Sequence, residues 1–282
     1  MIWVNGERLP NDGRHISALD RGLTLADGAF ETMRARHGMV FRLERHLARL
    51  ARTLRALQMP EPPEIRDWLM AAVRSADLPA AGVRLTVTRG AGPPGVLPPD
   101  DAEPTVLVTV DPMPAFPASI YAAGLSAFVV PGRRNEYAMT AGLKTLAFTE
   151  NVAALLEARR QGTDEALFLD IEGHCSEASA SNLFIRADGV LTTPPLSCGV
   201  LPGITREAVL ELARAGGMPP AERAFTLDDL LRADEAFLTS SLRGLVPLVR
   251  VAETPIGGGT PGELTRRLSS AYAELVSREG EA

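Results

Sequence analysis

The sequence has little of what marks several large classes of protein. Its two cysteines, Cys175 and Cys198, cannot form a disulfide framework, and neither has the spacing of a metal motif. The four histidines form no group with ligand spacing, so the sequence predicts no metal site. No apolar run approaches the roughly 18–20 residues of a membrane span, and the first ten residues contain no signal-peptide core. These absences lead us to expect a reduced, cytoplasmic protein.

Excess positive charge and nucleotide-binding loops are missing as well. The formal net charge is −6, which argues against a nucleic-acid partner held by a basic surface. A doubly wound nucleotide-binding enzyme is a further alternative, but the chain has no G-x-G-x-x-G or Walker-type loop. What is present is a chain of 282 residues, 45% of them hydrophobic, which is long enough for roughly two domains.

The order of the predicted elements indicates an α/β chain in two parts. In the first part the pattern predicts a hairpin at 2–9, helices at 42–57 and 64–76, and strands at 29–36, 39–41, 83–89 and 105–110. In the second part it predicts helices at 149–160, at 204–215 and from 263, and strands at 125–130, 166–170, 182–186, 190–192, 236–239 and 245–251. A Pro-rich stretch at 111–119 separates the parts. We therefore predict a small N-terminal α/β domain over 1–115, a linker over 116–122 and a larger C-terminal α/β domain over 123–282.

The helix predicted at 42–57 is strongly amphipathic, because leucines recur at spacings of three and four. Arg49 lies at the edge of this leucine stripe, from which its side chain can reach inward. Arginine suits bidentate contacts with phosphate, whereas the alternative interpretation is a solvent-facing arginine.

The strand predicted at 83–89 alternates, with valine and leucine on one face and Arg84 among threonines on the other. A polar face on a central strand indicates either a wet pocket, in which Arg84 could bind a carboxylate, or an outward surface. Phe30 follows the turn at Asp27-Gly28 and is either a pocket residue or a core aromatic.

The stretch from 165 to 206 contains the strongest chemical signals. Glu177 precedes the small residues 178–181, where a flat group could approach the backbone. The helix start at 203–205 offers backbone N–H groups, which are the usual basis of a phosphate site. Upstream, Lys144 precedes a helix and has apolar neighbours, which favours burial and a lowered pKa.

These segments resemble the fold-type IV pyridoxal-phosphate enzymes, or class IV aminotransferases. That family includes branched-chain and D-amino-acid aminotransferases and 4-amino-4-deoxychorismate lyase. Its landmarks appear here in order: L-D-R-G…D-G-A-F-E-T at 19–32, R-L…H-L-A-R-L at 42–50, G-L-K-T-L at 142–146, and E-x-S-x-S-N-L-F…L-P-G-I-T-R at 177–206. The resemblance covers nearly the whole chain and implies a C-terminal domain that is a pseudo-barrel.

The resemblance also implies roles for individual residues. Lys144 would be the catalytic lysine that forms a Schiff base with pyridoxal 5'-phosphate, and Glu177 would face the pyridine nitrogen. The residues implied as phosphate ligands are Arg49, Ile204, Thr205, Ser240 and Ser241. The candidates for substrate binding are Phe30, Arg84, Arg89 and Arg134. The implied activity is transfer of an amino group from an amino acid or amine to a 2-keto acid by a homodimer.

Departures from the family pattern leave the substrate open. Pro94 and Val96 replace the loop arginine and histidine with which relatives bind the substrate carboxylate, and Gly82 replaces a tyrosine of branched-chain enzymes. Ala147 and Thr149 also differ from common residues after the lysine. The alternatives are therefore an aminodeoxychorismate lyase, which eliminates pyruvate, and a non-catalytic pyridoxal-phosphate or phosphate-binding protein. The intact pair Lys144 and Glu177 argues against the latter.

Overall fold

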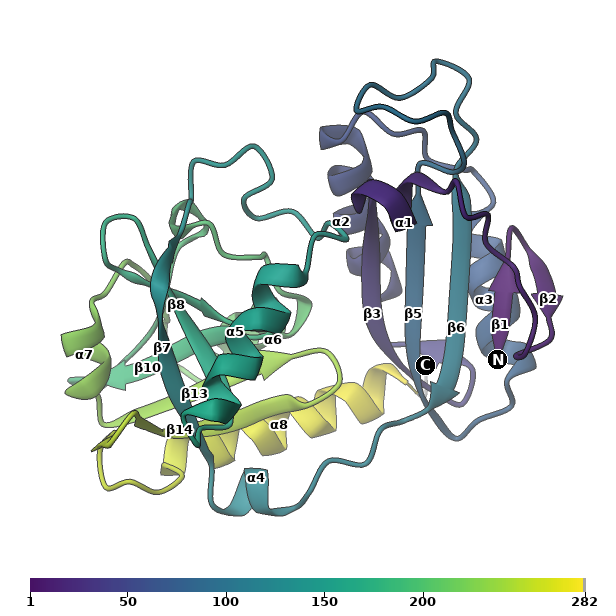
Figure 1. Cartoon of the computed structure of the whole chain (residues 1–282). Helices are drawn as coiled ribbons and strands as arrows, with labels where there is room; N and C mark the ends of the chain where they lie inside the picture. The colour runs from purple at the N-terminus through teal and green to yellow at the C-terminus, as the bar shows by residue number, and fades with distance from the viewer. Residues whose placement is uncertain (281–282) are drawn as a thin grey trace. The chain divides into compact units, whose positions relative to one another are not determined.

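The computed structural model describes residues 1–280, which belong to two compact units. Unit 1 contains residues 1–114 and 143–147 and the chain's last residues from 277. Unit 2 contains residues 115–142 and 148–276. Each unit has its own sheet, and each is described by itself below (Figure 1).

Unit 1 is built on a six-stranded antiparallel sheet with the order β2-β1-β6-β5-β3-β4. Its strands are β1 (Ile2–Val4), β2 (Glu7–Leu9), β3 (Gly28–Arg36), β4 (Met39–Val40), β5 (Ala80–Thr88) and β6 (Thr105–Pro112). The helices of this unit are α1 (Arg21–Leu25), α2 (Leu43–Ala56) and α3 (Ile65–Ser75). The predicted hairpin and both predicted helices are present, whereas α1 had not been predicted.

The core of unit 1 lies between the sheet and the helices α2 and α3 (Figure 1). Leu50 and Leu54 of α2 pack there with Val83 and Leu85 of β5, and all four are at most 1% exposed. The alternation of β5 therefore does what its sequence predicts, since its apolar residues face the core and Arg84 lies on the other face.

The short segment 143–147 joins unit 1 by pairing with the first residues of β3. The backbone N–H of Phe30 donates to the carbonyl of Lys144 at 3.0 Å, and the N–H of Leu146 donates to the carbonyl of Gly28 at 3.0 Å. Thr145 forms an isolated bridge with Ala29. This pairing fixes the backbone on both sides of Lys144.

Unit 2 is built on a nine-stranded mixed sheet that closes on itself. The path β12-β11-β10-β13-β14-β7-β8-β9 is completed by a pairing of β9 with β10, so six strands form a ring. The closing pair is Glu177 with Asn182. This closure agrees with the expected pseudo-barrel.

The strands of unit 2 are β7 (Leu125–Arg134), β8 (Glu165–Asp170), β9 (Cys175–Ala178), β10 (Asn182–Ala187), β11 (Val190–Thr193), β12 (Ala221–Glu222), β13 (Glu235–Ser240), β14 (Gly244–Val251) and β15 (Thr254–Pro255). Its helices are α4 (Ser119–Ala122), α5 (Thr149–Arg160), α6 (Ile204–Ala215), α7 (Leu227–Leu231) and the 3-10 turn η1 (Leu196–Cys198). The last helix, α8 (Glu263–Glu279), begins in unit 2, and its final residues belong to unit 1. Sequence patterns had not predicted β9, β12, β15, α4 or α7.

The predicted domain boundaries stay a prediction. Compact unit 1 ends its first segment at Pro114, close to the expected end of the N-terminal domain at 115. It also contains residues 143–147, which the sequence placed in the C-terminal domain. Among the helices of residues 1–280, none combines the length and hydrophobicity that crossing a bilayer requires.

Candidate active site

Lys144 is held beside an aromatic ring in unit 1. Its Nζ atom lies 4.3 Å from the centroid of the Phe30 ring, within the range of a cation–π contact. The peptide N–H of Lys144 also points at the Thr53 hydroxyl of α2, at 3.4 Å. Together with the pairing to β3, these contacts fix the position from which the lysine side chain starts.

Arg84 contacts the same aromatic ring. Its guanidinium carbon lies 3.9 Å from the Phe30 centroid, and its Nε donates to the Thr86 hydroxyl at 3.2 Å. Phe30 is 5% exposed, whereas Arg84 is exposed on the strand face that looks away from the core. One ring therefore connects a lysine and an arginine, an arrangement that suits a substrate with a carboxylate.

Arg49 belongs to a buried group of three charged or titratable side chains in unit 1. Its Nε and Nη2 donate to the two carboxylate oxygens of Glu31 at 2.8 and 2.6 Å. His46 Nδ1 lies 2.7 Å from Glu31 Oε2. The three residues are at most 7% exposed, so Arg49 is an inward-facing residue as its place on the leucine stripe predicts.

Burial and pairing change the pKa values in this group. Burial alone would raise the pKa of Glu31, but the hydrogen bonds and charge of Arg49, with those of His46, lower it from 4.5 to about 2. Burial lowers the pKa of His46 from its ordinary 6.5, against the attraction of Glu31. A neutral His46 can therefore donate its Nδ1 proton to the Glu31 carboxylate.

Glu177 is the best-supported acidic residue in unit 2, because three donors hold its carboxylate. Arg134 Nη1 donates to Oε1 at 2.8 Å, while the Asn182 side chain and the Leu201 backbone N–H donate to Oε2 at 3.2 and 3.0 Å. The Arg134 guanidinium in turn lies 4.1 Å from the centroid of Phe168. Arg134 was expected to bind substrate, and its observed partner is instead the side chain of Glu177.

The start of α6 has the features of an anion site. Gly203 is the N-cap and provides no side chain to cap the first turn. A Cβ at position 203 would overlap Oδ1 of Asn182, which explains why glycine stands there. Ile204 and Thr205 follow and are buried, and Ser240 and Ser241 are half-buried at the end of β13. The first backbone N–H groups of a helix favour phosphate by geometry and by dipole.

Arg89 was a further candidate for substrate binding, and its contacts are structural. Its Nε and Nη2 donate to the Asp27 carboxylate at 2.7 and 3.1 Å. Its Nη1 and Nη2 also donate to the carbonyls of Gln58 and Leu57, just after α2. Arg89 is 8% exposed, so it ties the turn before β3 to the end of α2, and we do not assign it to substrate.

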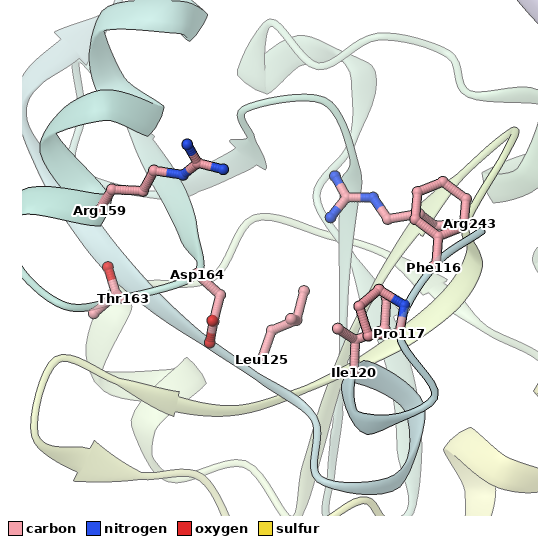
Figure 2. A pocket seen from close by; sticks show the side chains of 8 residues that line it. All are labelled: Phe116, Pro117, Ile120, Leu125, Arg159, Thr163, Asp164 and Arg243. Carbon is pink, nitrogen blue, oxygen red and sulfur yellow. The ribbon is translucent and has the colours of Figure 1, made fainter. Parts of the chain in front are cut away.

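The cavity of about 430 Å³ in unit 2 contains none of the predicted site residues. It is lined by Phe116, Pro117, Ile120, Leu125, Arg159, Thr163, Asp164 and Arg243 (Figure 2). Its polar groups have partners within the unit, because Arg243 donates to Glu165 and Asp164 accepts from Ser126. We assign this cavity no role in the chemistry.

Two signals in the sequence had been missed. Lys144 is the only lysine among the 282 residues, and the other basic residues are all arginines or histidines. A reaction that needs a lysine amine can therefore use only this one. Glu31 and His46 had not been considered either, although their place next to Phe30 and Arg49 in the family's own motifs could have drawn attention to them.

Comparison with known proteins agrees with the fold and the site. The model of the family "Amino-transferase class IV" matches residues 28–251. A putative branched-chain-amino-acid aminotransferase of Methanocaldococcus jannaschii is 34% identical, over 99% of this chain and 97% of the relative. Among solved structures, 4-amino-4-deoxychorismate lyase from Pseudomonas aeruginosa has a TM-score of 0.87 and 35% identity, over 97% of this chain and 98% of its own. The branched-chain amino acid aminotransferase of T.th., solved with pyridoxamine 5'-phosphate, has a TM-score of 0.92 and 29% identity, over 99% and 94%.

The closed mixed sheet, the N-terminal antiparallel sheet and the residues they position define an enzyme of the aminotransferase type. The chain belongs to the class IV aminotransferase family.

Proposed function

We propose that the protein is a pyridoxal-phosphate-dependent transaminase that moves an amino group between an amino acid and a 2-keto acid. The observation that carries the proposal is the position of Lys144. The chain's only lysine is anchored next to β3 with its amine over the ring of Phe30, and Arg84 contacts the same ring.

The residues in each unit fit one part of the cofactor. In unit 1, Lys144 would supply the amine that carries the cofactor, and Arg49, whose guanidinium is fixed by Glu31, would bind the phosphate. In unit 2, Glu177 would face the pyridine nitrogen, with the N-terminus of α6 at Ile204 and Thr205 as a phosphate site. Ser240 and Ser241 would add hydroxyl or N–H donors to that site.

When bound, pyridoxal phosphate supplies an electron sink for charge that develops at the substrate's α-carbon. The chain's own residues do the rest. The amine of Lys144 would take a proton from the α-carbon and return it, which is general acid–base catalysis. Arg84 would bind the substrate carboxylate, and Phe30 would hold both cationic side chains in place. Arg134 would keep the Glu177 carboxylate oriented.

For the substrate we propose the branched-chain amino acids with their 2-keto acids, because the curated relative above and one of the two solved structures carry that name. The lyase reaction is a second candidate, favoured by the 35% identity to a 4-amino-4-deoxychorismate lyase. A homodimer and a cytoplasmic location stay predictions from the resemblance and the sequence.

The first experiment tests the role of Lys144. The protein loaded with pyridoxal phosphate is reduced with borohydride, digested and analysed by mass spectrometry. We expect the phosphopyridoxyl mass on the peptide with Lys144 alone, since this is the only lysine. Lys144→Ala should remove both the label and turnover, and Lys144→Arg should do the same although it keeps the charge. Turnover that persists in both variants would contradict the mechanism.

The second experiment separates the two reactions. The loaded enzyme is mixed in turn with L-amino acids, D-amino acids, primary amines and aminodeoxychorismate while the cofactor absorbance is followed. A transaminase changes to the pyridoxamine form with a donor and returns with 2-oxoglutarate or another keto acid. If no donor changes the spectrum while aminodeoxychorismate yields pyruvate over many turnovers, the lyase assignment replaces the transaminase.

A further inference from the structure

Three side chains of unit 2 that the proposed chemistry does not use come together in space. Asp170 is the last residue of β8, His174 directly precedes β9, and Cys198 ends the turn η1. Their ligand atoms all lie within 4.8 Å of one another. Asp170 is 2% exposed and Cys198 is 4% exposed, while His174 is half-buried at the edge of the group.

The separations in this group match those between ligands of one small metal ion. His174 Nδ1 lies 3.4 Å from Asp170 Oδ2. For ligands about 2.0–2.1 Å from Zn²⁺ in a tetrahedron, nitrogen and oxygen lie about 3.3 Å apart. The same 3.4 Å is too long for a good hydrogen bond between an imidazole and a carboxylate. The pair is therefore better explained as two ligands than as donor and acceptor.

The backbone around the group is already fixed. Asp170 Oδ1 accepts the backbone N–H of His174 at 2.7 Å, which orients the carboxylate and leaves Oδ2 toward His174 Nδ1. The N–H of Asp170 donates to the carbonyl of His174 at 2.9 Å and closes the turn between β8 and β9. The carbonyl of Cys198 accepts from the Ser176 hydroxyl at 2.9 Å. Binding a metal ion would need only small shifts of these side chains.

We propose that Asp170, His174 and Cys198 form a zinc site. An aspartate, a cysteine thiolate and a neutral histidine together carry two negative charges, which balance Zn²⁺. The carboxylate of Glu172 lies 3.8 Å from His174 Nδ1 and adds negative charge on the solvent side. Binding releases the thiol proton of Cys198 to solvent while the sulfur–zinc bond forms, so no oxidant or reductant is involved.

The site is structural and lies outside the proposed catalytic groups. Cys198 belongs to η1, and three residues later the N–H of Leu201 donates to Glu177. A bound ion would attach this loop to the turn between β8 and β9. We therefore expect zinc to stabilise the loop and the unit that contains it, whichever reaction the enzyme catalyses.

Cobalt is the probe, because a cysteine–cobalt bond absorbs light in the near ultraviolet. The holoenzyme is dialysed against a chelator and titrated with Co²⁺. We expect one equivalent of Co²⁺ to bind with thiolate-to-cobalt absorption and to be displaced by Zn²⁺. Zinc should also raise the melting temperature of the chelated protein. Absence of the thiolate band would overturn the proposal.

Variants identify the ligands. Cys198→Ser should abolish the thiolate band, and His174→Gln should weaken Co²⁺ binding by about tenfold or more, as loss of a ligand requires. His174 is only half-buried, so its replacement tests the site even if Cys198→Ser folds poorly. Cys175→Ser is the matched control, because Cys175 is a second buried thiol outside the group. A band that survives Cys198→Ser, or that is lost only in Cys175→Ser, would show that the ligands are assigned incorrectly.

Discussion

Arg49 and Glu31 form a bidentate ion pair inside unit 1, with two guanidinium nitrogens 2.8 and 2.6 Å from the two carboxylate oxygens. Glu31 is 0% exposed, and His46 is its second partner. A buried pair of this kind is destabilising to break, because one charge is left without compensation. It also fixes the plane of the guanidinium, so that Arg49 can meet a phosphate without losing rotamer freedom on binding.

The first prediction separates these two roles of Arg49. Arg49→Ala leaves Glu31 buried and unpaired, so we expect the free energy of unfolding to fall by about 3–5 kcal/mol. The double variant Glu31→Gln with Arg49→Met removes both charges and should be much less destabilised. Tryptophan fluorescence during urea unfolding measures this, because both tryptophans, Trp3 and Trp68, lie in unit 1.

The phosphate role is measured by comparing two variants that both lack the Glu31 charge. Glu31→Gln alone retains Arg49, and the double variant does not. We expect pyridoxal phosphate to bind about 1.5–3 kcal/mol more weakly to the double variant, which is the contribution of a hydrogen bond to a charged group. Equal affinities would show that Arg49 only supports the fold.

The second prediction is that unit 1 loses stability in acid. The pKa of Glu31 is about 2 in the folded chain and 4.5 when unpaired, so the unfolded chain binds more protons between these values. Stability from Glu31 is thus fully present above about pH 5 and is lost as the pH falls toward 2. The change amounts to about 3 kcal/mol. His46 acts in the same direction, since its lowered pKa means that the unfolded chain protonates first as the pH falls below 6.5.

The check is the difference in unfolding free energy between the natural chain and Glu31→Gln, measured from pH 7 to pH 2. We expect this difference to shrink as the pH falls below 5, because protonated Glu31 and glutamine are both neutral. A difference that stays constant with pH would contradict the assigned pKa.

Sequence patterns predicted the elements better than the contacts between them. The leucine spacing in α2 predicted its length and placed Arg49 at the edge of the buried face, and both predictions agree with the structure. The pairing of Arg49 with Glu31 joins a helix to a strand 18 positions away, which no local pattern reveals. The same limit explains Arg89 and Arg134, whose partners Asp27 and Glu177 are distant in sequence.

Strand β9 shows a second limit of sequence patterns. Its residues Cys175–Ala178 are all buried, so they do not alternate between polar and apolar side chains. The spacing rule for metal sites failed for a related reason, since Cys198 reaches Asp170 and His174 only through the fold of unit 2. Charged and functional residues that meet across the sheet thus have to be read from the structure.

The third prediction concerns Glu177. Glu177→Gln keeps the shape of the side chain but removes the negative charge that we assign to the pyridine nitrogen. We expect kcat to fall by a factor on the order of 100, as for loss of one electrostatic group in an active site. The cofactor should remain bound, as judged by its absorbance. Glu157→Gln is the control, because Glu157 pairs with Arg160 at the surface, and its kcat should be unchanged. Unchanged kcat in Glu177→Gln would remove the assignment.

The last prediction concerns the substrate carboxylate. Arg84 is exposed, contacts the ring of Phe30 and shares a strand face with Thr86, whereas Arg89 and Arg134 are both held by acidic partners. Arg84→Ala should therefore raise the KM for the amino acid by a factor on the order of 10–100, which corresponds to about 1.5–3 kcal/mol for a charged hydrogen bond. The affinity for pyridoxal phosphate should change much less, and Arg84→Lys should recover part of the KM. Arg66→Ala is the control, since Arg66 forms an exposed pair with Glu44 and should leave KM unchanged. If Arg84→Ala weakens cofactor binding as much as substrate binding, Arg84 supports the cofactor site through Phe30 and the carboxylate must be bound elsewhere.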